Sequence, residues 1–172
     1  MAEAMPYQIA VLCYVFDEAG RVLLLHRAKP PNHELYSPPG GKLDQASGES
    51  PVACASRELA EEVGLHVGPG DLHLTGMVSE RAYEGAGHWL MFLFELTFTV
   101  SLTPAAFREG TLGWHHPSEL VNLPIPETDR QVIWPLFWRY RGQFFSAHID
   151  CSGKHLSWRL EQPAAKVARD IS

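Results

Sequence analysis

The segment Pro51–Val63 places the strongest constraint on how this chain folds. Ser50 can cap the first turn of a helix, and Pro51 fits the first helical position because no N–H donor is needed there. Gly64 stands where a helix commonly ends. The sequence therefore predicts one helix over Pro51–Val63.

This helix is predicted to have an apolar side and an acidic side. At 100° per residue, Val52, Leu59 and Val63 share one narrow arc. About a quarter of a turn or more away lie three acidic side chains, which are Glu58, Glu61 and Glu62. Because carboxylates three and four residues apart repel one another, we expect a cation between them. From the helix alone, the alternative is a solvent-exposed charged face that Arg57 stabilises.

The loop before the helix adds further fixed positions. The stretch GGKLDQASGESPVACASRELAEEVGL resembles the Nudix box, Gx5Ex7REUxEExGU, in which U is an aliphatic residue. From Glu49 onward every position agrees, including the pair Arg57 and Glu58. One departure precedes it, because Gly41 lies eight residues before Glu49 instead of six, as though two residues were inserted between Lys42 and Gly48.

The resemblance implies an α/β fold, namely a Nudix-type α/β/α sandwich around a mixed β-sheet. A length of 172 residues agrees with a single domain. We expect this domain to span residues 1–172, with a core at about 6–161 and a loosely ordered tail at 163–172. The activity implied is hydrolysis of a nucleoside diphosphate linked to another moiety.

The resemblance also assigns a metal site. Glu58, Glu61 and Glu62 would bind one to three Mg²⁺ or Mn²⁺ ions, together with the backbone carbonyl of Gly41. Hard divalent ions of this kind prefer oxygen ligands and share their coordination with substrate phosphates.

Other residues are assigned supporting and catalytic roles by the same resemblance. Arg57 and Glu49 would hold the helix and the loop together. The general base would be Glu58 or Glu61, or else Glu109, which follows Phe107 in a later loop where related enzymes often carry an acidic residue. For Glu109 the alternative is an ordinary exposed loop acid.

Residues outside the box must select the substrate, and we expect a nucleoside triphosphate, such as one with an oxidised purine. Glu127, Asp129 and Trp134 resemble the group that reads the base in oxidised-purine triphosphatases. The alternatives are surface exposure for the two acids and core packing for Trp134. Arg27 and Lys29 are candidate phosphate contacts, with ordinary surface charge as the alternative. Aromatic candidates for the pocket are His33, Tyr36, Tyr83, His88 and Trp89.

The remaining elements follow from the apolar pattern and the turn residues. Tyr7–Phe16 and Val22–Leu25 are predicted to form a hairpin. Trp89–Val100 is too apolar for a solvent-facing strand, so it is predicted inside the sheet. The other predictions are strands at Leu72–Ser79 and Thr111–Trp114, a helix at Glu127–Tyr140 kinked by Pro135, and a closing hairpin of Gln143–Ile149 and His155–Leu160.

Charge and composition exclude several classes of partner and compartment. The net charge of −6 argues against a protein whose main partner is long nucleic acid. The first ten residues hold no Lys or Arg, and no apolar run approaches the ~20 residues of a membrane span. Three widely spaced cysteines, interpreted as core thiols, suit a reducing compartment. We therefore expect a cytoplasmic protein, and the sequence leaves open whether it forms a homodimer.

Three functions are compatible with these residues. The first is a pyrophosphohydrolase that converts a nucleoside triphosphate to a monophosphate and pyrophosphate. The second is a Nudix hydrolase of another diphosphate, such as ADP-ribose, a nucleotide sugar or a dinucleoside polyphosphate. The third, a noncatalytic nucleotide-binding module, predicts the loss of a metal-binding carboxylate. All three box glutamates are present, which favours an enzyme.

Overall fold

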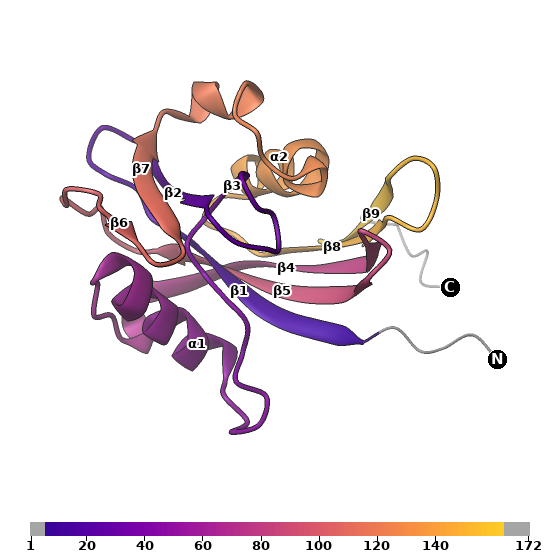
Figure 1. The fold of residues 1–172 in the computed structure, drawn as a ribbon, viewed down its shortest axis with the longest axis horizontal. Helices are drawn as coiled ribbons and strands as arrows, with labels where there is room; N and C mark the ends of the chain where they lie inside the picture. The colour runs from indigo at the N-terminus through magenta and orange to yellow at the C-terminus, as the bar shows by residue number, and fades with distance from the viewer. Residues whose placement is uncertain (1–5, 164–172) are drawn as a thin grey trace, which may run out of the picture.

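A computed structural model describes residues 6–163, so residues 164–172 of the predicted tail lie outside the described residues. Figure 1 shows two sheets with helical segments on both sides, α1 below and α2 above. This arrangement confirms the predicted α/β/α sandwich. Within residues 6–163, no helix combines the length and the apolarity that crossing a bilayer requires.

The larger sheet contains five strands in the order β1-β5-β4-β8-β9. The strands are β1 (Tyr7–Tyr14), β4 (Leu72–Tyr83), β5 (Gly87–Leu96), β8 (Phe145–Asp150) and β9 (Ser157–Gln162). The pairs β1/β5 and β4/β8 are parallel, whereas β4/β5 and β8/β9 are antiparallel. The sheet is therefore mixed, as predicted. Both the interior position of β5 and the closing hairpin of β8 and β9 are also confirmed.

The smaller sheet is antiparallel, with the order β3-β2-β7-β6. Its strands are β2 (Val22–Arg27), β3 (Tyr36–Ser37), β6 (Ala106–Phe107) and β7 (Gly110–His115).

The predicted hairpin at the start of the chain is wrong, because its two strands do not pair with each other along their length. Its turn forms, because the Asp17 carboxylate accepts hydrogen bonds from the backbone and side chain of Arg21. Beyond the bridge between Phe16 and Val22, however, β1 joins the larger sheet and β2 the smaller one. The apolar residues of β1 are buried by packing between layers, so local pattern alone cannot choose its partner strand.

The predicted helix at 51–63 is present as α1 (Pro51–Glu58), continued by a π-helical turn η1 (Leu59–Val63). The Ser50 side chain accepts a hydrogen bond from the backbone N–H of Ala53, and Gly64 ends the helix with a φ of 77°. Both predicted ends are therefore confirmed.

The predicted separation of an apolar from an acidic side is only partly correct. The buried residues of this helix are Cys54, Ala55, Glu58, Leu59 and Glu62. Val52 and Val63 are half-buried. Two of the three glutamates thus lie at the edge of the core, because the π-helical turn and the glycine loop bring them against the sheet.

The late helix consists of a π-helical turn η4 (Asp129–Ile133) followed by α2 (Trp134–Arg139). The irregular turn ends two residues before Pro135, which has no N–H to donate to the preceding turn, so the predicted interruption is confirmed. Two short 3₁₀ helices, η2 (Pro69–Asp71) and η3 (Pro117–Val121), complete the described elements.

Two apolar cores hold the layers together. One packs α1 and η1 against the sheets, through Cys54 and Leu59 among others. The other packs the late helix against the opposite side and includes Trp134 and Tyr14, whose ring centroids are 5.0 Å apart. Because Trp134 is only 4% exposed, it belongs to the core, which is the alternative to a role in reading the base.

Candidate active site

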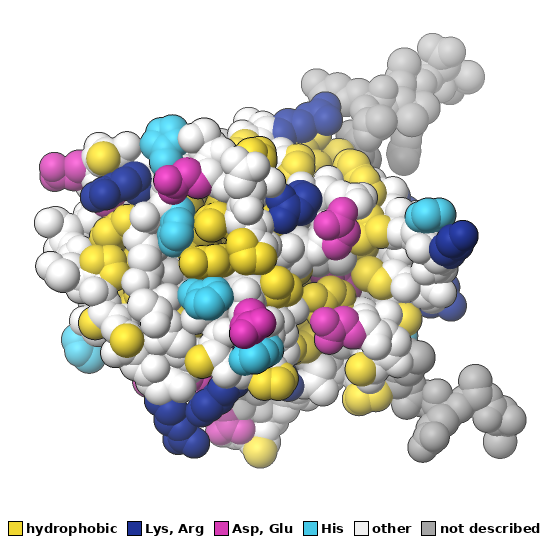
Figure 2. Space-filling model, turned by 45° about the horizontal axis from the view of Figure 1, so that its top comes forward, with side chains coloured by type: hydrophobic (Ala, Val, Ile, Leu, Met, Phe, Trp, Pro, Cys, Tyr) yellow, Lys and Arg dark blue, Asp and Glu magenta, His cyan; other side chains and the backbone are white. Residues whose placement is uncertain are grey.

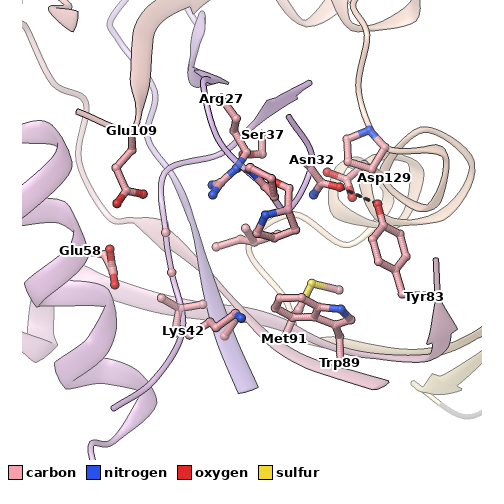
Figure 3. Close-up of a pocket in the computed structure, with 18 of the residues that line it drawn as sticks. Arg27, Asn32, Ser37, Lys42, Glu58, Tyr83, Trp89, Met91, Glu109 and Asp129 are labelled. Carbon is pink, nitrogen blue, oxygen red and sulfur yellow. Dashed lines mark hydrogen bonds between the residues drawn. The ribbon is translucent and has the colours of Figure 1, made fainter. Parts of the chain in front are cut away.

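One pocket joins α1 to the late helix across the middle of the molecule. Its volume is about 460 Å³, which is sufficient for a nucleoside-sized ligand. Figure 3 shows Glu58 and Glu109 facing each other at one end, with Asn32, Tyr83 and Asp129 gathered at the other. The pocket therefore has a carboxylate-rich end beside α1 and a separate polar end beside η4.

The loop before α1 passes the carboxylate-rich end of the pocket, and two of its positions there require glycine. A Cβ on Gly40 would lie 2.1 Å from the carbonyl oxygen of Val11, and the φ of Gly40 is +151°. A Cβ on Gly41 would lie 2.3 Å from Oε1 of Glu58. The loop thus reaches the sheet and the Glu58 carboxylate only because these positions carry no side chain.

The extended part of the loop forms a compact turn. The backbone N–H of Asp44 donates to Glu49 (2.8 Å), and the N–H of Glu49 donates back to the Asp44 carbonyl (3.1 Å). Gly48 closes the turn with a φ of +71°. Because the extra residues turn outward between Asp44 and Glu49, Gly41 keeps its place against Glu58.

Arg57 connects the loop to the helix through several ion pairs. Its Nε and Nη2 atoms donate to the two carboxylate oxygens of Glu49, at 2.8 and 2.9 Å. Its Nη1 donates to Glu58 at 2.6 Å, and Nη2 reaches the Lys42 carbonyl at 3.2 Å. The predicted pairing of Arg57 with Glu49 is therefore present. The Arg57 hydrogen bonds hold the pKa of Glu49 at about 2.

The carboxylates at this end carry more negative charge than the described side chains neutralise. Burial raises the pKa of Glu58, and the charges of Glu61 and Glu109 raise it further. Burial also raises the pKa of Glu62 to about 7, with Glu58 and Glu109 adding to the shift, although the Gly40 N–H donates to this carboxylate at 2.9 Å. Such a site favours binding of a cation.

The donor set fits a hard divalent cation in its chemistry, since it is made of carboxylate oxygens. Within residues 6–163, however, no three acidic, histidine or cysteine side chains converge on one point as metal ligands do. The Arg57 side chain holds Glu58, and Glu61 is 60% exposed and 3.4 Å from Nη1 of Arg57. The carbonyl of Gly41 accepts hydrogen bonds from the backbone N–H of Val11 (2.9 Å) and from the thiol of Cys54 (3.8 Å), the second of which is the weaker.

Glu109 is placed by the tight turn between β6 and β7. Its carbonyl accepts a hydrogen bond from the N–H of Ala28 (2.9 Å). The following Gly110 passes so close to β2 that a Cβ there would lie 2.1 Å from the His26 carbonyl oxygen. The side chain of Glu109 points across the pocket toward Glu58, and both residues line it.

The middle of the pocket has a basic and an aromatic lining. The Nζ atom of Lys42 lies 5.3 Å from the ring centroid of Trp89, and Met91 lies beside that ring. Arg27 also lines the pocket, with its Nε donating to the Pro31 carbonyl at 2.8 Å. Cationic groups thus lie between the two polar ends.

The end beside η4 contains two deeply buried acids. Glu80 on β4 is 3% exposed and Asp129 on η4 is 6% exposed, and both line the pocket. Burial raises the pKa of Glu80 to about 7 and that of Asp129 to about 8, the latter also because of the nearby Glu80 charge. The neighbouring Thr128 hydroxyl opposes these shifts.

The structure brings only some of the predicted substrate residues to the pocket. Arg27 and Asp129 line it, as do the aromatic candidates Tyr83 and Trp89. Five others are placed outside its lining, namely Lys29, His33, Tyr36, His88 and Glu127. Lys29 is exposed, Tyr36 packs between His26 and His115, and Glu127 faces solvent and pairs with Gln131 and Arg130.

Sequence reasoning missed Glu80, although a signal for it existed. In β4, alternate residues share one face of the sheet, so Glu80 points the same way as Val78, which is buried. A carboxylate at such a position is rarely buried without a function. Asn32, Ser37, Lys42 and Thr128 were missed as well, and nothing local distinguishes them from other loop residues.

Figure 2 shows the face that carries α2 and the smaller sheet, where acidic, basic and histidine side chains are interspersed with apolar ones.

Comparisons with known proteins agree with this geometry. The NUDIX domain family matches residues 6–134. An uncharacterised Nudix hydrolase of Bacillus subtilis, YvcI, is 29% identical over 75% of this chain and 79% of its own length. A Mycobacterium tuberculosis protein provisionally named 8-oxo-dGTP diphosphatase 2 is 30% identical over 76% of this chain and 89% of its own. The crystal structure of a MutT protein from Bacillus halodurans superimposes with a TM-score of 0.70 at 26% identity, covering 90% of this chain and 97% of that one.

Proposed function

The chain belongs to the NUDIX domain family and is a hydrolase of phosphoric anhydride bonds, and from that premise we propose that it cleaves a nucleoside triphosphate to the monophosphate and pyrophosphate. The observation that carries this proposal is the division of the pocket. The carboxylates of Glu58 and Glu109 lie at one end and Asp129 at the other, with Lys42 and Trp89 between them. A nucleotide placed along this pocket has its phosphates beside the carboxylates and its base beside Asp129.

In this proposal the glutamates of α1 and η1 hold Mg²⁺ or Mn²⁺ together with the Gly41 carbonyl, where the ion would replace the weak thiol donor Cys54. When bound, the ion neutralises phosphate charge and lowers the pKa of the attacking water. The excess negative charge around Glu58 and Glu62 supports this assignment, since buried carboxylates with raised pKa values gain most from a nearby cation.

The remaining roles belong to the side chains that face the pocket. Arg27 and Lys42 contact phosphate oxygens as donors. Glu109 is proposed as the general base, since it approaches the phosphate end from the side opposite Glu58 and no described ion pair holds its carboxylate. Arg57 is a positioning residue that orients Glu58 through their 2.6 Å hydrogen bond.

The proposed base site combines Asp129 with an aromatic face. Trp89 offers a surface for stacking, while the Asp129 carboxyl can hydrogen-bond to a base edge. The resemblance to the protein provisionally named as an 8-oxo-dGTP diphosphatase supports an oxidised purine as one substrate to test.

A substrate panel with Mg²⁺ tests the proposal directly. We expect inorganic pyrophosphate and a nucleoside monophosphate from at least one triphosphate, with 8-oxo-dGTP compared with the unmodified triphosphates. Activity confined to ADP-ribose, nucleotide sugars or dinucleoside polyphosphates would instead assign the enzyme to another diphosphate substrate. Nucleotide binding without any hydrolysis would contradict both enzymatic assignments.

A further inference from the structure

The loop of residues 28–35, here called the strap, joins β2 to β3 and forms one wall of the polar end of the pocket. Its tip contributes Pro30, Pro31 and Asn32 to the lining. Most of the other strap residues are exposed to solvent. Because little of the strap packs into the core, few apolar contacts oppose its movement.

The two ends of the strap are fixed by backbone hydrogen bonds. The N–H of Arg27 donates to the Leu35 carbonyl at 3.0 Å, and the N–H of Ala28 donates to the Glu109 carbonyl at 2.9 Å. These bonds anchor the strap to β2 and to the turn between β6 and β7. Movement of the strap is therefore restricted to its tip, which pivots on anchored ends.

A single long-range hydrogen bond holds the tip. The Tyr83 hydroxyl donates to Oδ1 of Asn32 at 2.7 Å, as Figure 3 shows. Burial raises the pKa of Tyr83, so this hydroxyl keeps its proton and remains a donor. Within residues 6–163, no other hydrogen bond joins positions 29–33 to the chain beyond residues 27–35. Hydrogen bonding thus attaches the tip to the opposite wall at one point.

Both partners of this hydrogen bond lie in strained backbone. Asn32 has a φ of 61° and Glu34 a φ of 63°, while Ala82 and Glu84, on either side of Tyr83, have φ values of 53° and 51°. Left-handed backbone is unfavourable for most residues other than glycine, and it persists only where surrounding contacts hold it. Breaking the hydrogen bond would allow both walls to relax, which lowers the cost of opening.

We propose that the strap is a gate latched by the Tyr83–Asn32 hydrogen bond, and that it opens to admit the nucleotide and to release the monophosphate. This inference rests on the proposed function, because it assumes that the nucleoside occupies the polar end. One neutral hydrogen bond favours the closed state by only about 2-fold to 10-fold, which suits repeated opening. Loop movements of this kind occur in microseconds to milliseconds.

Nuclear magnetic resonance of the ligand-free protein tests the gate without any nucleotide. Relaxation dispersion should detect exchange in the strap and at residues 82–85, and Tyr83→Phe should raise the open population by about 2-fold to 10-fold. Tyr140→Phe is the matched control, because Tyr140 packs on Phe145 outside the pocket lining, and it should leave the exchange unchanged. A wild-type strap without exchange, or identical exchange in Tyr83→Phe, would overturn the inference.

Binding kinetics connect the gate to the nucleotide. Stopped-flow fluorescence, with Trp89 in the pocket as a reporter, measures association and dissociation of 8-oxo-dGMP, or of the monophosphate of the best triphosphate in the panel. Tyr83→Phe should raise both rate constants by the same factor, about 2-fold to 10-fold, with an unchanged Kd, because a gate controls passage in both directions. Faster dissociation alone would identify a ligand contact, and unchanged rates a purely structural hydrogen bond. Either result would overturn the gate.

Asn32→Gly removes the hydrogen-bond acceptor from the other wall and tolerates the φ of 61°, so it also serves if Tyr83→Phe folds poorly. It should raise both rate constants as well. Adding Tyr83→Phe to it should have no further effect, because the hydrogen bond is already absent, and a further increase would contradict the latch. Failure of the proposed function is distinct, because it appears as no pyrophosphate from any triphosphate while exchange of the strap in the ligand-free protein persists.

Discussion

The Glu58 carboxylate packs directly on the Cα of Gly41, so closely that a Cβ at that position would come within 2.3 Å of Oε1. This contact fixes the position of the loop relative to the helix whose glutamates are proposed to bind the metal. The tight approach lies before the outward turn at 44–48 in the chain, so the extra residues of that turn do not separate Gly41 from Glu58.

The contact predicts that Gly41→Ala reduces turnover by about 100-fold, because the methyl group displaces the Glu58 carboxylate by an amount that catalytic geometry does not tolerate. Stability should fall only modestly, since the end of a side chain can move. The measurement is kcat together with the melting temperature. Gly70→Ala, where nothing lies within 4 Å of the new Cβ, is the control and should leave turnover unchanged. Equal turnover in both variants would contradict the prediction.

Glu61→Gln should abolish most activity without affecting folding. Glu61 is 60% exposed, so loss of its charge has little effect on the core, whereas a carboxylate that binds the metal contributes to catalysis by orders of magnitude. The measurement is kcat across a Mg²⁺ titration, with circular dichroism to verify the fold. Glu18→Gln, in the exposed turn after β1, serves as the comparison. A folded Glu61→Gln variant with wild-type turnover would remove Glu61 from the metal site.

The pair of Arg57 and Glu49 should be measurable in a double-mutant cycle. Arg57→Gln and Glu49→Gln each remove a two-point ion pair, and their coupling free energy is expected to be about 1 kcal/mol, because Arg57 is one-third exposed. Denaturant unfolding of the two single variants and the double variant provides the value. Additive effects would show that the pair does not stabilise the fold.

Acid stability should depend on the same pair. The pKa of Glu49 is lowered from 4.5 to about 2, so its contribution to stability is present above pH 4.5 and is lost as the pH falls toward 2. In Glu49→Gln, the loss of stability between pH 4.5 and 2 should be shallower than in the wild type. Unfolding midpoints measured across this range provide the test, and identical slopes would contradict it.

Glu80 and Asp129 should make folding stability decrease as the pH rises, which is opposite to the effect of Glu49. Their pKa values are raised from 4.5 to about 7 and from 3.8 to about 8, so stability is highest while both are protonated and falls as the pH rises toward these values. The neighbouring titratable groups Tyr14, Tyr83 and Cys151 add no positive charge to offset this.

The measurement is the melting temperature from pH 5 to 9 without metal or nucleotide. The decline should be weaker in Glu80→Met and Asp129→Asn. Part of it should persist, because the raised pKa of Glu62 acts in the same direction. An unchanged pH dependence in both variants would show that the two acids titrate normally.

Features that depend on residues close together in the sequence could be predicted, whereas features that depend on contacts between distant residues could not. The limits of the helix, the interruption at Pro135 and the pairing of Glu49 with Arg57 depend on residues close in sequence, and each was predicted. Glu127 and Asp129 could not be separated in this way. One faces solvent and the other lies in the pocket, and only the packing of η4 against the sheet decides which.

By itself, the sequence determined the helix, its two ends and the family to which the chain belongs, because these depend on local spacing. Tertiary structure alone decided which sheet each early strand joins, and that Glu80 meets Asp129 at the far end of the pocket. The physical reason is that burial and the meeting of distant side chains arise from the packing of layers, which local periodicity does not specify.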